Sequence, residues 1–228
     1  GSDTFVINST AGAKIADLGA TDILQVADAS LVTVDVVESF TATAATTNAV
    51  VSAADSSTGT TLTLKDGVNV DMTLSTLTAA ANGYTIKTDA AVTTGATIVG
   101  SRAADVITGS KFADKITGGE GADTITAGAG ADTIILTESV SAADIVKFTA
   151  VSDSAASVAA NTTVTFDTIT DFATTVDKLN IADINTALTG AAAATAVAAS
   201  TTKAIGGATV VNDFAGLVTD AGALTASA

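Results

Sequence analysis

The sequence contains no cysteine, histidine, proline or tryptophan. Without cysteine there can be no disulfide framework, and without cysteine and histidine the usual zinc sites and histidine-dependent catalysis are excluded. Aromatic residues make up only 4% of the chain, so any core must be built from Val, Ile, Leu and small residues. A structural metal bound by oxygen ligands is the remaining way to cross-link such a chain.

Basic residues are also scarce. Nine Lys and Arg stand against 24 Asp and Glu, which gives a net charge of −15. The chain has no basic patch, which argues against nucleic acid or anionic lipid as partners. Two interpretations of the acidity remain, namely a soluble acidic surface or the binding of divalent cations.

Long apolar runs are missing as well. No run reaches the roughly 18 residues that a transmembrane helix needs, and the Ala-rich stretch at 190–200 is shorter. No N-terminal signal peptide is evident. Because the chain begins with Gly1, we expect a processed product or a piece of a larger protein.

The segments outside the centre of the chain favour β-strands. Thr and Val are abundant, and apolar residues alternate with polar ones in "TLTL" (61–64) and "VNVDMTL" (68–74). Residues 1–98 therefore predict a β-rich solenoid or sandwich-like region, and residues 148–228 a β-rich C-terminal cap region. Within the cap, residues 186–200 predict a short helix or a loop.

Four nonapeptides lie between these regions, at 100–108, 109–117, 118–126 and 127–135. Position six is always Asp and position eight always Ile. One repeat cannot bury its own Ile, so stacked repeats predict an interior column of isoleucines. Four carboxylates brought together in this way repel one another unless cations neutralise them. The acidic residues are Asp105, Asp114, Asp123 and Asp132, and the apolar ones are Ile107, Ile116, Ile125 and Ile134.

The first six residues of each repeat form a short turn rich in Gly. Gly adopts positive-φ conformations that let several backbone carbonyls point inward, where the Asp closes the turn. Calcium takes six to eight oxygen ligands and suits such a set of carbonyls and carboxylates. Residues 99–147 therefore predict a calcium-binding region. A flexible Gly/Ala linker is the alternative, and the strict Asp and Ile spacing disfavours it.

The repeat "GGEGADTIT" (118–126) matches the GGxGxDxUx pattern of the RTX (repeats-in-toxin) family, and the four tandem copies make this resemblance specific. The resemblance implies an all-β fold with a parallel β-roll or β-solenoid, in which each nonapeptide is half a coil. It also implies that Asp105 pairs with Asp123 on one edge, and Asp114 with Asp132 on the other. Backbone carbonyls near seven glycines would complete the calcium sites: Gly100, Gly109, Gly118, Gly119, Gly121, Gly128 and Gly130.

The first two repeats depart from this pattern. Ser101 and Ser110 replace the second Gly, and Ala103 and Phe112 replace the third. In the fourth repeat, Ala127 replaces the leading Gly. We therefore expect about two well-formed calcium sites, with weaker affinity at the first turn.

Two flanking segments extend the resemblance. "GATDILQV" (19–26) with "VVESFTA" (36–42) resembles RTX-type surface-layer proteins, and "FDTITDFATTVDKLNIADI" (166–184) resembles the segment that caps the roll in secreted RTX proteins. In the second segment, Asp167, Asp171 and Asp177 are either further calcium ligands or ordinary turn and strand-end residues.

These resemblances imply an extracellular bacterial structural protein, of a surface layer or a similar assembly, that is exported by type I secretion and folds in calcium outside the cell. Self-association into a lattice or filament is expected, and cell-surface polysaccharide is a further candidate partner. The alternative is a non-catalytic RTX region of a type I-secreted enzyme or adhesin. We expect no enzymatic activity, because the G-x-S-x-G, H-E-x-x-H and Walker motifs do not occur.

Overall fold

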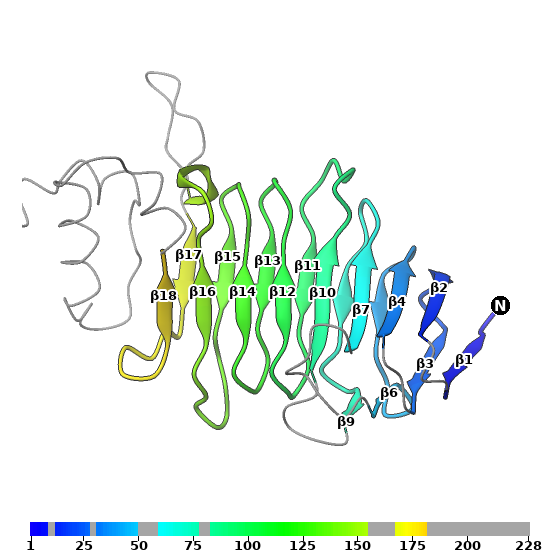
Figure 1. Ribbon diagram of the computed structural model, residues 1–228. Coiled ribbons are helices and arrows are strands. Elements are labelled where there is room, and N and C mark those ends of the chain that lie inside the picture. The colour runs from blue at the N-terminus through cyan, green and yellow to red at the C-terminus, as the bar shows by residue number, and fades with distance from the viewer. Residues whose placement is uncertain (9–11, 28–30, 50–58, 78–82, 155–166, 182–228) are drawn as a thin grey trace, which may run out of the picture.

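The computed structural model describes residues 1–8, 12–27, 31–49, 59–77, 83–154 and 167–181. These residues form a parallel β-solenoid whose successive coils stack side by side (Figure 1). The prediction of an all-β parallel roll is confirmed. The helix or loop predicted at 186–200 lies outside the described residues.

The described strands form three parallel sheets. The short sheet contains, in order, β1 (Thr4–Ile7), β3 (Ile23–Val26), β6 (Thr47–Asn48) and β9 (Thr76–Leu77). The long sheet contains β2 (Ala13–Leu18), β4 (Leu31–Val36), β7 (Gly59–Leu64), β10 (Tyr84–Thr88), β12 (Val106–Thr108), β14 (Thr124–Thr126), β16 (Ile145–Lys147) and β18 (Lys178–Asn180). The third sheet contains β5 (Phe40–Thr41), β8 (Val70–Asp71), β11 (Thr97–Val99), β13 (Lys115–Thr117), β15 (Thr133–Ile135) and β17 (Thr168–Thr170). A single turn of 3₁₀ helix, η1 (Val151–Ser154), follows β16.

The coils change shape where the nonapeptides begin. Upstream, a coil can contribute a strand to each of the three sheets, but the short sheet ends at β9 and later coils visit only the other two. Ile98 pairs with Val70 on one side and with Ile116 on the other, so the coil shortens from 28 to 18 residues. Two nonapeptides supply two strands and two turns, which is enough for a flattened two-sided coil and leaves no residues for a third side.

The stacking is continuous across the junction between the predicted first and second regions. Residue 98 lies inside β11, and β11 pairs with β8 of the upstream part and with β13 of the repeats. The upstream coils therefore continue into the nonapeptides through backbone pairing of β10 with β12 and of β11 with β13.

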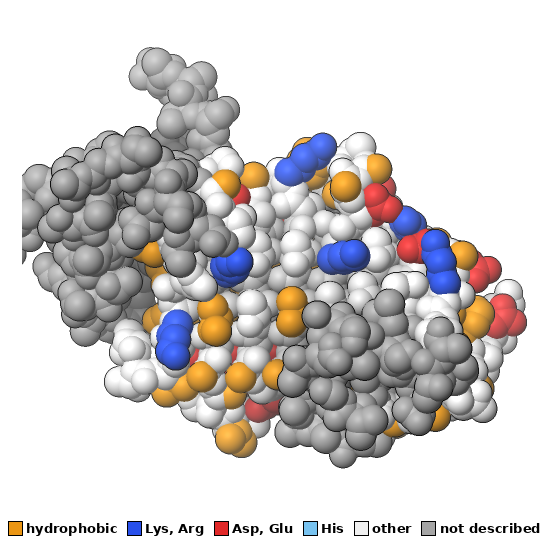
Figure 2. Space-filling model, viewed as in Figure 1, with side chains coloured by type: hydrophobic (Ala, Val, Ile, Leu, Met, Phe, Trp, Pro, Cys, Tyr) orange, Lys and Arg blue, Asp and Glu red, His pale blue; other side chains and the backbone are white. Residues whose placement is uncertain are grey.

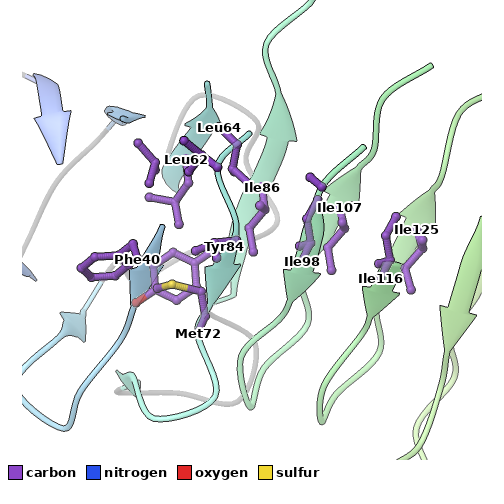
Figure 3. Close-up of a cluster of buried hydrophobic side chains, with 14 of the residues drawn as sticks. Phe40, Leu62, Leu64, Met72, Tyr84, Ile86, Ile98, Ile107, Ile116 and Ile125 are labelled. Atoms are coloured by element: carbon purple, nitrogen blue, oxygen red, sulfur yellow. The ribbon is translucent and has the colours of Figure 1, made fainter. Parts of the chain in front are cut away.

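In the nonapeptide part of the solenoid, the centre of the core is the column of isoleucines predicted from the repeats. Each three-residue repeat strand turns its central side chain inward, and Ile107, Ile116, Ile125 and Ile134 are all fully buried. Figure 3 shows three of these side chains, those of Ile107, Ile116 and Ile125, between the two sheets and in line with Ile86 and Ile98 from the coils before them. The wider upstream coils enclose larger side chains, and Phe40, Met72 and Tyr84 fill that space.

Candidate metal centre

The four repeat aspartates lie at the last turn position before a strand, and all four are at most 3% exposed. The backbone N–H of Asp105 donates to Oδ1 of Asp123 over 2.7 Å. On the other edge, the N–H of Asp114 donates to Oδ1 of Asp132 over 2.8 Å. The structure thus brings together the same two pairs that the repeat resemblance implies.

The rows of aspartates continue past the repeats. Along the first edge, the N–H of Asp123 donates to Asp144 over 2.8 Å, and that of Asp144 donates to Asp177 over 3.1 Å. Along the second edge, the N–H of Asp132 donates to Oδ1 of Asp167 over 2.9 Å. We refer to Asp105, Asp123, Asp144 and Asp177 as the first Asp ladder, and to Asp114, Asp132 and Asp167 as the second.

Sequence reasoning missed Asp144 and left the roles of the downstream aspartates open. A signal was present, because Asp144 and Asp167 each stand two residues before a buried Val or Ile, as in the repeats. Asp171 does not belong to a ladder. It has a positive φ of 62°, which marks it as a turn residue, and its carboxylate accepts a hydrogen bond from the Thr137 hydroxyl.

The repeat turns are of two kinds. In the first two repeats, a serine closes the turn on its own aspartate. The N–H of Ser101 donates to Asp105 Oδ2, and the N–H of Ser110 donates to Asp114 Oδ2, both over 2.6 Å. Both serine hydroxyls also lie within hydrogen-bonding distance of the same carboxylates.

The third and fourth repeats have glycines at these turn positions. Four of them have positive φ, namely Gly119, Gly121, Gly128 and Gly130. In these turns the second carboxylate oxygens, Oδ2 of Asp123 and Oδ2 of Asp132, are buried and have no hydrogen-bond partner. A buried carboxylate oxygen without a partner is costly, and a bound cation would remove that cost.

The electrostatics of the ladders support a cation. Burial raises the pKa of Asp123 to about 9, and the neighbouring Asp105 carboxylate adds to the shift. Burial likewise raises the pKa of Asp132 to about 7. Both shifts mean that the folded chain disfavours the ionised carboxylates unless a positive charge lies beside them.

The donor set fits calcium. Among the described residues no three acidic side chains converge on one point, so backbone carbonyls must supply most ligands of a cation at the ladder. Calcium accepts such mixed oxygen ligands, whereas structural zinc sites use cysteine and histidine, which this chain lacks.

Close stacking explains why glycine begins the first three repeats. A Cβ added to Gly100 would lie 1.8 Å from the carbonyl oxygen of Gly118, and one on Gly109 would lie 2.2 Å from that of Ala127. A Cβ on Gly118 would lie 2.5 Å from Asp123 Oδ2. A side chain at Gly100 or Gly109 would push adjacent coils apart, and one at Gly118 would clash with the carboxylate of its own repeat.

A parallel β-roll with buried aspartates at its turns defines a calcium-binding repeat fold. Residues 99–134 match the family described as the RTX calcium-binding nonapeptide repeat, in four copies. The chain therefore contains RTX repeats, in which calcium has a structural and not a catalytic role, and which are typical of secreted bacterial proteins. No curated protein and no solved structure matches the chain significantly.

No helix among the described residues has the length and apolarity that crossing a bilayer requires.

Proposed function

We propose that this chain is a structural part of a bacterial extracellular assembly, such as a surface layer, that folds and is held together by calcium outside the cell. One observation carries the proposal. Every described carboxyl group whose pKa is raised lies in one of the two Asp ladders, between one coil and the next. We therefore assign the carboxyl groups with raised pKa to the stacking of one coil on the next, and we propose no catalytic role.

In this proposal, the calcium concentration determines whether the chain folds. At low calcium the ladder carboxylates are ionised in the unfolded chain, and burying them without a counter-charge opposes folding. A cation that binds the folded state and not the unfolded one adds its binding free energy to stability. The chain is thus suited to export through a type I secretion system in an unfolded form, with folding in extracellular calcium.

The charge distribution supports self-association. The strands from β12 to β18 contain three lysines, Lys115, Lys147 and Lys178, and no acidic residue. Figure 2 shows basic side chains spread over the visible broad face of the solenoid. The acidic side chains of this part of the chain that are not buried, Glu120, Glu138 and Asp171, are by contrast in the turns. A face of one copy against a turn edge of another would bring opposite charges together, which favours a regular arrangement that weakens at high salt.

Calcium addition to metal-stripped protein tests the proposal. We expect circular dichroism to show a gain of β-structure, followed by light scattering and negative-stain microscopy that show ordered lattices or filaments at millimolar calcium. Magnesium at the same concentration is the control, because it keeps its waters and suits octahedral sites. A β-signal that does not respond to calcium would overturn calcium-dependent folding. Folded monomers at every calcium concentration would overturn the assembly role and favour a non-catalytic region of a secreted enzyme or adhesin.

A further inference from the structure

We infer that the chain has a cation site outside the matched repeats, between Asp132 of the fourth repeat and Asp167, which lies 35 residues further along the chain. The inference deepens the proposed calcium-dependent role and rests on it. It assigns to Asp167 a binding function that the nonapeptide pattern does not contain, because the repeat match ends at residue 134.

Asp167 occupies the same structural position as a repeat aspartate. It stands directly before β17, which pairs with β15 in register, Ile169 opposite Ile134. Its neighbour Thr168 donates its N–H to the carbonyl of Asp132 over 2.7 Å, just as Thr133 donates to the carbonyl of Asp114 over 2.8 Å. The longer connection between β15 and β17 therefore changes the path of the chain but not the arrangement at the ladder.

Two buried oxygens without partners belong to this pair. Oδ2 of Asp132 and Oδ2 of Asp167 form no hydrogen bond, although the two residues are only 1% and 3% exposed. A third carboxylate, that of Asp153 after β16, is 7% exposed and lies close enough to raise the pKa of both. Asp132 and Asp167 each have a buried, unsatisfied oxygen, and a third buried acid lies nearby, so a bound positive charge would stabilise the ionised pair.

The spacing of the coils suits one calcium ion. Neighbouring strands lie about 4.8 Å apart, and calcium binds oxygen at about 2.3–2.6 Å. One ion between two adjacent rungs can therefore contact a carboxylate oxygen of each. The turn before Asp132, where Gly128 and Gly130 have positive φ, supplies the backbone carbonyls that are the remaining ligand candidates.

The end of the first ladder provides a matched comparison. Asp177 also stands directly before a terminal strand, β18, and accepts the N–H of the preceding rung on Oδ1. Its Oδ2, however, accepts the N–H of Ala173 over 2.7 Å. Asp177 is thus satisfied by its own turn, as Asp105 and Asp114 are, while Oδ2 of Asp167 has no hydrogen-bond partner.

A calcium count on three variants of the full chain tests this site. Native mass spectrometry and isothermal titration with calcium are applied to the unmodified chain, Asp167→Asn, Asp177→Asn and Asp123→Asn. We expect Asp167→Asn to bind one calcium ion fewer, and Asp177→Asn to bind as many as the unmodified chain. Asp123→Asn, in the matched repeats, should also lose an ion. An unchanged count for Asp167→Asn overturns the inference, and so does an equal loss in Asp177→Asn.

The same series separates this inference from the proposed function. Loss in Asp123→Asn without loss in Asp167→Asn leaves calcium binding by the repeats intact and removes only the added site. A flat titration of the unmodified chain removes both. If Asp167→Asn does not fold, as judged by circular dichroism in calcium, crystals of the unmodified chain soaked in terbium give the answer. An anomalous peak between the Oδ2 atoms of Asp132 and Asp167 supports the site, and a map without that peak overturns it.

Discussion

Ser101 donates its backbone N–H to Oδ2 of Asp105 over 2.6 Å, and its hydroxyl lies 3.1 and 3.0 Å from the two oxygens of the same carboxylate. The protein itself thus provides hydrogen-bond donors to the carboxylate oxygens that a cation would otherwise contact. Ser110 likewise donates its N–H to Oδ2 of Asp114 over 2.6 Å, and its hydroxyl lies 3.2 Å from Oδ1. This is a physical reason for the expectation that the first turn binds calcium weakly.

Replacing Ser110 should convert a turn of the serine kind into one of the glycine kind. In Ser110→Gly the turn can adopt the positive φ seen at Gly128, and Asp114 loses the hydroxyl. We expect one additional calcium ion by titration, together with a lower melting temperature in chelator, because hydrogen bonds to charged groups contribute about 1.5–3 kcal/mol. Ser110→Ala is the control and should lower stability without adding an ion. An unchanged count in Ser110→Gly would contradict the prediction.

The metal-free protein should become less stable as the pH rises above 4. Burial raises the pKa to about 6 for Asp144, to about 7 for Asp105, Asp132 and Asp167, and to about 9 for Asp123. The folded state therefore holds protons that the unfolded state has released, and stability falls with pH between about 4 and 9. Melting temperatures measured in calcium-free buffer should be highest near pH 4–5. At saturating calcium this decline should disappear, because calcium binds the deprotonated carboxylates. A metal-free melting temperature that rises from pH 5 to pH 8 would refute the prediction.

Two adjacent residues of β12 test the isoleucine column. Ile107 is fully buried between the sheets, while Val106 is 47% exposed on the outer face. Ile107→Ala should destabilise the folded chain by about 2–5 kcal/mol, because it removes buried methyl groups and leaves a cavity. Val106→Ala should change stability by less than about 0.5 kcal/mol, as is usual for surface substitutions. Urea unfolding in calcium measures both, and equal effects would show that the column is not the core.

Gly95 tests the close stacking of turns outside the nonapeptides. A Cβ there would lie 1.8 Å from the carbonyl oxygen of Ala113, a backbone atom that cannot move without shifting the next coil. Gly95→Ala should therefore cost about 1–3 kcal/mol or more. Gly19→Ala is the matched control, because its nearest contact at 3.3 Å is the flexible end of the Glu38 side chain. Thermal melting that ranks Gly19→Ala as the more damaging change would count against this packing.

The structure of the repeats could be predicted from the sequence because the residues that determine each turn and strand lie within one nonapeptide. An Asp at every ninth position and an Ile two residues later determine a six-residue turn and a three-residue strand, and two such units make one coil of 18 residues. The periodicity itself predicts the buried isoleucines, while the parallel roll and the juxtaposition of Asp105 with Asp123 and of Asp114 with Asp132 follow from the resemblance to the RTX repeat. The calcium ligation itself stays a prediction for the experiments above.

The tertiary structure decided which aspartates join the ladders and which of them are left without partners. Asp144 and Asp167 keep the two-residue spacing to a Val or Ile, but they follow connections of irregular length, so only the stacking of β16 and β17 on the repeats shows that they reach the ladder edges. Hydrogen bonds within single turns also separate Asp105 and Asp114, satisfied by serines, from Asp123, Asp132 and Asp167, each with a buried oxygen unpaired. That distinction depends on the direction of individual N–H groups in the folded turns, and the sequence signals it only where Ser101 and Ser110 replace glycine.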